Sequence, residues 1–88
     1  MRISTLSILA ALGAILSVQP ALAASCYDLW YERNAIYNDN GYCFKTRLGR
    51  DTFDNSDCYT KRPNFSRSEQ NQIDSLKEEE DSRGCNVN

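Results

Sequence analysis

WYERNAIYNDNGYCF, residues 30–44, is the stretch that decides the fold, because it concentrates the large apolar side chains of a short chain. It holds the only Trp, three of the five Tyr and one of the three Phe, so we expect it to supply most of the core. Side chains spaced for one face of a helix begin just before it, at Leu29, Trp30, Arg33, Ile36 and Tyr37. This spacing predicts a helix over residues 28–39, and Ser25, followed three residues later by Asp28, can cap its start.

The end of that helix is indicated by Gly41, which follows three polar residues and tolerates the positive φ that closes a helix. Tyr42 and Phe44 are then expected to point the same way from an extended segment. The remaining helices are predicted over residues 46–54 and 67–83. The predicted fold is therefore mainly α, a small three-helix, disulfide-stapled domain with short extended segments between the helices.

The two later helices differ in the strength of their signals. The second rests on Leu48, Thr52 and Phe53 sharing a face, and Gly49 weakens it by roughly 1 kcal/mol relative to Ala. The third begins with a capping box, in which Ser66 is followed three residues later by Glu69. A narrow apolar stripe follows, and Gly84 is placed to end the helix.

The central stretch resembles the signature of the YARHG domain family, a small module of bacterial envelope proteins. The resemblance rests on the signature residues, namely Arg33, Asn34, Ile36, Tyr37, Gly41, Tyr42 and Phe44. Further matching positions extend it over about residues 26–85. The chain departs from the pattern at Asn38-Asp39-Asn40, where the family has Ala, Arg and His, and at Cys58, where a Trp is usual. The resemblance implies an envelope-associated module and no particular activity.

The first 23 residues are typical of a secretory signal. Arg2 precedes an apolar run over residues 6–18, and the small residues Ala21 and Ala23 suit cleavage after Ala23. The run is shorter than the roughly 20 residues of a membrane span, so a retained anchor is the less favoured alternative, and we expect no span in the mature chain. A lipid on Cys26 is another alternative, but it would leave an odd number of cysteines. We expect one domain, residues 24–88, in the periplasm or secreted.

The four cysteines, Cys26, Cys43, Cys58 and Cys85, all fall in this predicted domain. An even number of cysteines in a short exported chain predicts two disulfides, whereas the absence of His makes a zinc site the weaker alternative. Short connections favour antiparallel long helices, which would bring the start of the first beside the end of the last. Of the three ways to pair the cysteines, we therefore predict Cys26–Cys85 and Cys43–Cys58.

The charge of the predicted mature chain is slightly negative. Removing Arg2 leaves nine Lys and Arg against twelve Asp and Glu, a balance that argues against a nucleic-acid binder. Residues 45–67 are nevertheless basic and residues 69–88 acidic. Solvated faces that pair with each other explain this distribution, and a binding patch is the alternative. We expect a monomer.

Catalysis is not indicated by the residues present. The absence of His removes the usual base for a Ser or Cys nucleophile, and no spacing singles out a pair among Asp28, Glu32 and Asp39. No cofactor or metal is expected. Most of the aromatic side chains are expected in the core, including Tyr59 in a short packed segment, with Tyr27 and Tyr31 outside.

The function predicted from the sequence is non-catalytic binding of an envelope polymer or protein, and a small secreted enzyme or inhibitor is the alternative. The expected contact region joins a turn to a nearby basic segment, because polar residues on a turn between rigid elements are well placed for recognition. It comprises Asn38, Asp39, Asn40, Lys45, Arg47 and Arg50. A purely structural turn with solvated charges explains the same residues. Arg33 is expected to form a structural salt bridge or to bind a loop carbonyl.

Overall fold

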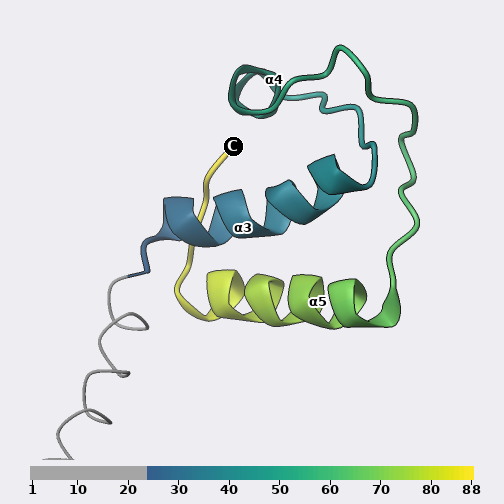
Figure 1. The fold of residues 1–88 in the computed structure, drawn as a ribbon. Coiled ribbons are helices and arrows are strands. Elements are labelled where there is room, and N and C mark those ends of the chain that lie inside the picture. The colour runs from purple at the N-terminus through teal and green to yellow at the C-terminus, as the bar shows by residue number, and fades with distance from the viewer. Residues whose placement is uncertain (1–23) are drawn as a thin grey trace, which may run out of the picture.

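The computed structural model describes residues 24–88, and the predicted signal, residues 1–23, lies outside the described residues. Three helices follow one another: α3 (Cys26–Asp39), α4 (Arg47–Thr52) and α5 (Arg67–Ser82) (Figure 1). Residues 24–88 contain no strand beyond an isolated parallel bridge between Tyr42 and Thr60. The predicted three-helix, mainly α fold is confirmed, although α4 stops before residue 54 because Phe53 is extended, with φ −120° and ψ 144°.

The two long helices lie side by side and run in opposite directions (Figure 1). At one end of the pair, the Asn40 amide donates to Glu69 at the start of α5 over 3.2 Å. At the other end, Cys26 is bonded to Cys85, with 5.5 Å between their Cα atoms. The second disulfide, Cys43–Cys58, closes the loop that contains α4. Both predicted pairings are confirmed, and Cys26–Cys85 follows from the antiparallel arrangement of the long helices.

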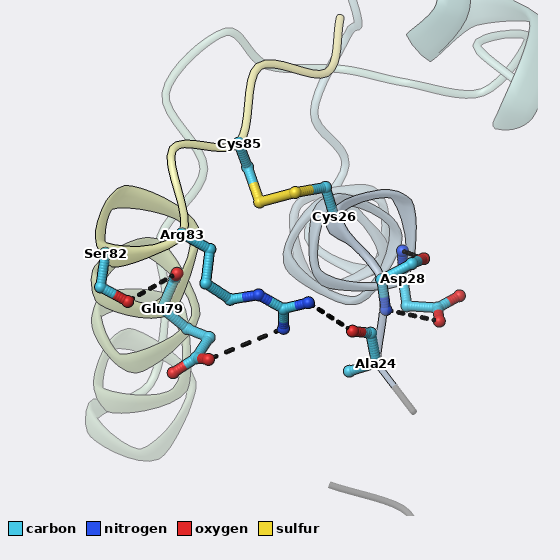
Figure 2. Close-up of polar contacts among 8 residues, drawn as sticks. Ala24, Cys26, Asp28, Glu79, Ser82, Arg83 and Cys85 are labelled. Carbon is cyan, nitrogen blue, oxygen red and sulfur yellow. Dashed lines mark hydrogen bonds and ion pairs between the residues drawn. A yellow bond between two sulfur atoms is a disulfide. The ribbon is translucent and has the colours of Figure 1, made fainter. Parts of the chain in front are cut away.

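A polar contact accompanies the disulfide that ties the start of α3 to the end of α5 (Figure 2). The Arg83 guanidinium donates to the Ala24 carbonyl oxygen over 2.6 Å and lies 3.7 Å from the Glu79 carboxylate. Because this contact joins residues 59 positions apart, it holds the first described residue against the end of the last helix. This end of the helix pair is therefore fixed both covalently and by hydrogen bonding.

Both long helices begin with the predicted capping boxes. The Ser25 hydroxyl accepts from the Asp28 N–H, and the Asp28 carboxylate accepts from the Ser25 N–H. Ser66 and Glu69 repeat this arrangement at α5. The Ser66 N–H and, secondarily, the Asn40 amide hold the pKa of the Glu69 carboxyl below its usual value. These local bonds satisfy N–H groups that would otherwise have no partner at the helix starts.

The core lies between α3, α4 and the segment that connects them. Trp30, Phe44 and Phe53 are its centre, each 5–6% exposed, and the rings of Phe44 and Phe53 stack at 4.9 Å. The chain after α5 returns across α3 toward α4, so that Val87 packs on the same cluster (Figure 1). Ile73 is the residue of α5 that is buried, at 1% exposure.

Gly49 in α4 is required for packing, although glycine is unfavourable in a helix. It is buried, and a Cβ at this position would lie 2.8 Å from Cδ1 of Phe44. A glycine in a helix costs roughly 1 kcal/mol relative to Ala. The close approach of the Phe44 ring explains why it occupies this position.

Candidate functional site

Arg33 joins the two long helices. Its Nε lies 2.7 Å from Oε2 of Glu80 and its Nη2 lies 2.9 Å from Oε1, a two-bond pairing between α3 and α5. The two side chains are only 21% and 13% exposed. The hydrogen-bonded Glu80 carboxylate raises the pKa of Arg33, so the guanidinium stays charged. The predicted structural salt bridge is confirmed, and its partner is Glu80.

Asn34 is buried, although the predicted apolar face of α3 did not include it. Its Nδ2 donates to the carbonyl oxygen of Trp30 over 2.8 Å. Its Oδ1 accepts no hydrogen bond from residues 24–88, whereas buried polar groups are normally paired. The spacing of four from Trp30 is the signal in the sequence that could have indicated its inward position.

Other signature residues pack the turn that follows α3. The Tyr37 ring meets Tyr42 and Phe65 edge-on, at 5.3 Å and 4.9 Å, and Tyr42 meets Phe44 in the same way at 4.9 Å. Gly41 adopts a φ of +81°, which a side chain would strain. Ile36 is half-buried in the last turns of α3. The signature residues thus serve mainly to shape the fold.

The prediction that Tyr59 would pack in the core is wrong, because its side chain is at the surface and the residue is 77% exposed. Its backbone N–H donates to the Gly41 carbonyl oxygen over 2.9 Å, which places the side chain outside the core. The ring lies across Gly41, where a Cβ would come within 2.2 Å of Cε2. Tyr27 and Tyr31 lie at the surface, as predicted, at 45% and 43% exposed.

Replacing Gly41 by Ala is expected to destabilise the protein for two separable reasons, the positive φ and the Tyr59 ring. The φ strain alone is worth about 1–2 kcal/mol, and the ring contact adds to it. In a Tyr59→Ala background, Gly41→Ala should therefore cost less, and urea unfolding of the four variants measures the difference. Tyr59→Ala alone serves as the control and should change stability little because the ring is exposed. Equal costs in both backgrounds would show that the ring does not constrain Gly41.

The contact region predicted from the sequence lies in two places. Asn38, Asp39 and Asn40 end α3. Lys45 precedes α4, Arg47 is its first residue and Arg50 lies in its last turn. α4 leads into Phe53, whose ring contacts Trp30 and Tyr31 in the first half of α3. No hydrogen bond or ion pair within residues 24–88 joins one group to the other.

Several members of this region have partners within the domain. The Asn40 amide donates to the Ile36 carbonyl oxygen over 2.8 Å as well as to Glu69. The Arg50 guanidinium donates to the Lys45 carbonyl oxygen, and Arg47 lies 3.7 Å from the exposed Asp51 carboxylate. The Lys45 side chain makes no hydrogen bond or ion pair with residues 24–88.

A groove of about 270 Å³ opens where the signature residues come together. One wall comes from α3, through Trp30, Arg33 and Asn34. The facing wall is the segment after the turn, through Tyr42, Phe44, Lys45 and Thr46. Val87 and Asn88 of the returning C-terminal segment complete it. Of the six residues predicted to form the contact region, Lys45 alone lines this groove.

The chemistry of the groove is mixed. Trp30 and Phe44 provide aromatic surface, and Asn34 adds a polar side chain whose Nδ2 is bonded to the Trp30 carbonyl oxygen. Lys45 contributes positive charge, whereas the charge of Arg33 is paired with Glu80. A small ligand with an apolar part and polar groups fits this combination.

Comparison with known proteins identifies the family. The model of the YARHG domain matches residues 7–81. The chain belongs to the YARHG domain family. No curated protein and no solved structure shows significant similarity to it. The family is extracellular or envelope-associated, and two disulfides fit an oxidising compartment.

In this YARHG domain, four signature residues do two things at once. Arg33 joins α3 to α5, Asn34 bonds to Trp30 within α3, and Tyr42 and Phe44 pack the core. All four also line the groove. Within residues 24–88, no three His, Cys, Asp or Glu side chains are placed to hold a metal ion. The described helices include none that is long and apolar enough to cross a membrane.

Proposed function

We propose that this YARHG domain is an exported, non-catalytic module that binds an envelope polymer or protein through the groove, in the periplasm or outside the cell. The proposal includes cleavage of the predicted signal after Ala23 and a monomeric domain over residues 24–88. The observation that carries it is the convergence of four signature residues on one groove beside Lys45, whose side chain has no hydrogen-bond or ion-pair partner within residues 24–88. Polar and charged side chains that converge beside aromatic surface in one groove are typical of a binding site.

The absence of catalysis is part of the proposal, and the residues support it. The chain has no His, and Asp28 is engaged in the cap of α3. Arg33 is committed to Glu80, and the four cysteines are in disulfides. Among the groove-lining residues, the Thr46 hydroxyl accepts from the Gly49 N–H in the cap of α4, and no hydrogen bond within residues 24–88 joins a hydroxyl of the lining to a base. Hydrolysis of an envelope polymer by the pure protein would contradict this part of the proposal.

Lys45→Met is expected to weaken retention of the protein on envelope fractions roughly tenfold, because it removes the unpaired cation from the groove wall. Arg47→Met is the matched control, since this exposed residue carries the same charge two positions away and does not line the groove. Sedimentation with envelope fractions measures retention, and urea unfolding checks that both variants fold. Retention of Lys45→Met at the wild-type level would contradict binding at the groove.

A triple replacement separates the groove from the region predicted from the sequence. Changing Asp39, Arg47 and Arg50 together to Ala leaves the groove lining intact. We expect this variant to be retained like the wild type. Loss of retention with intact folding would instead favour the turn and the basic segment as the contact region.

A further inference from the structure

We infer that Asn40 is a deamidation site that the native turn keeps closed, and that the deamidated product cannot rebuild the contact between α3 and α5. Asn40 is the only asparagine of the chain that is followed by a glycine. Because glycine has no side chain to hinder attack by its nitrogen on the neighbouring amide, this pair is the reactive one in the sequence. The reaction does not depend on what the groove binds.

The reaction joins the backbone nitrogen of Gly41 to the side-chain carbon Cγ of Asn40. The new bond closes a succinimide ring, the bond from Cγ to Nδ2 breaks, and the amide leaves as ammonia together with the proton of the Gly41 N–H. Water then opens the ring at either carbonyl carbon. One opening gives aspartate, and the other gives isoaspartate, in which the main chain runs through the former side chain and is longer. No oxidant or reductant takes part.

The native turn holds the attacking nitrogen away from the Asn40 side chain. The Gly41 N–H donates to the Asn38 carbonyl oxygen over 3.1 Å. The ψ of Asn40 is 21°, which nearly eclipses the Gly41 nitrogen with the backbone nitrogen of Asn40 and turns it away from Cβ. Ring closure therefore requires rotation about ψ, which breaks the hydrogen bond to Asn38.

Gly41 is also held by the second extended segment. Its carbonyl oxygen accepts from the N–H groups of Tyr59 and Thr60, over 2.9 Å and 3.1 Å. The Tyr59 ring lies across the same residue. The disulfide Cys43–Cys58 ties the two segments together beside these bonds. Rotation at Asn40 therefore requires this corner of the domain to open.

The amide that leaves is itself a contact between the two long helices. Nδ2 of Asn40 donates to the Ile36 carbonyl oxygen over 2.8 Å and to Oε2 of Glu69 over 3.2 Å. After deamidation, an oxygen stands where both acceptors need a donor, and a second carboxylate faces that of Glu69. A negative charge at the C-terminal end of α3 is unfavourable as well. Deamidation thus converts a transient opening of the corner into a permanent loss of this contact.

Peptide mapping by mass spectrometry tests whether the turn is closed. The exported, disulfide-bonded protein is incubated at neutral pH, once native and once unfolded in guanidinium chloride, and the peptide that contains Asn40 is followed over time. We expect conversion to aspartate and isoaspartate in the unfolded protein, and a reaction slower by roughly a hundredfold or more in the native protein, because only opened molecules react. Equal rates would overturn the protection, and an Asn40 that stays intact in the unfolded protein would overturn the site.

Variants test the effect of the product on the contact. Asn40→Asp should lower the equilibrium constant for folding roughly tenfold in urea unfolding, because a hydrogen bond to the charged Glu69 is replaced by repulsion. Asn38→Asp is the matched control, since it adds the same charge to the same end of α3 and its side chain makes no hydrogen bond within residues 24–88. Equal losses from the two variants would show that the charge at the helix end is the cause and would overturn the role of Glu69.

Moving the amide across the contact assigns the loss to Glu69. In Glu69→Gln, a glutamine still suits the capping box of α5 and offers a donor to a carboxylate at position 40. Asn40→Asp should therefore lower the folding constant severalfold less in the Glu69→Gln background than in the wild type. The same loss in both backgrounds would overturn the claim that the product fails to rebuild this contact.

Discussion

Replacing both Cys26 and Cys85 by Ser is expected to lower the free energy of unfolding of the exported protein by about 4 kcal/mol. The two residues are 59 positions apart, so their disulfide removes much conformational freedom from the unfolded chain. A domain of about 65 residues is stable by only roughly 3–10 kcal/mol in total. Urea unfolding followed by circular dichroism should show most of that stability gone.

The matched control removes the other disulfide. Cys43 and Cys58 are 15 positions apart, and replacing both by Ser should cost about 3 kcal/mol by the same model. The first pair also anchors the segment that carries Val87 to the core, which adds to its effect. A smaller loss from removing Cys26–Cys85 than from removing Cys43–Cys58 would contradict this account.

Arg33→Met is expected to destabilise the protein by about 2–4 kcal/mol. The replacement leaves the Glu80 carboxylate, at 13% exposure, without its two hydrogen bonds. The residual exposure of both side chains places the expected loss below that of a fully buried pair. The stability of Arg33→Lys should lie between those of the wild type and Arg33→Met, because an ammonium keeps the charge but cannot reproduce the paired bonds of a guanidinium. Denaturant unfolding of the three proteins provides the measurement.

A double variant shows whether the unpaired charge causes the loss. Arg33→Met combined with Glu80→Met removes both charges and should be more stable than Arg33→Met alone. Arg47→Met is the control for losing a positive charge, since its ion pair with Asp51 is exposed and weak. If the double variant is no more stable than the single one, the unpaired carboxylate is not the cause.

The helices and disulfides could be predicted because their signals are local. Ser25 with Asp28 and Ser66 with Glu69 satisfy N–H groups within three residues, so the boxes formed as expected. The antiparallel arrangement of α3 and α5 then brought the outer cysteines together. Glu80 was not predicted as the partner of Arg33, because that contact spans 47 positions and depends on how the helices pack.

The groove could not be predicted, because it is assembled from three distant segments. No periodicity indicates that Val87 returns to the core or that Asn88 borders a site on α3. Tyr59 was misplaced because an aromatic residue in a small domain is expected inside, whereas its backbone pairing with Gly41 turns it outward. The predicted contact region is divided because the segment after α4 packs on the first half of α3.

Site-specific photo-crosslinking tests the central claim most directly, namely that the groove is the surface that meets the envelope. A benzoylphenylalanine is placed at Asn88, which is exposed and borders the groove, or at Lys77, which is exposed on α5 and does not. After irradiation of cells that export each variant, the account predicts a crosslinked envelope component from position 88 and none from position 77. Crosslinking from position 77 alone, or equally from both positions, would contradict it.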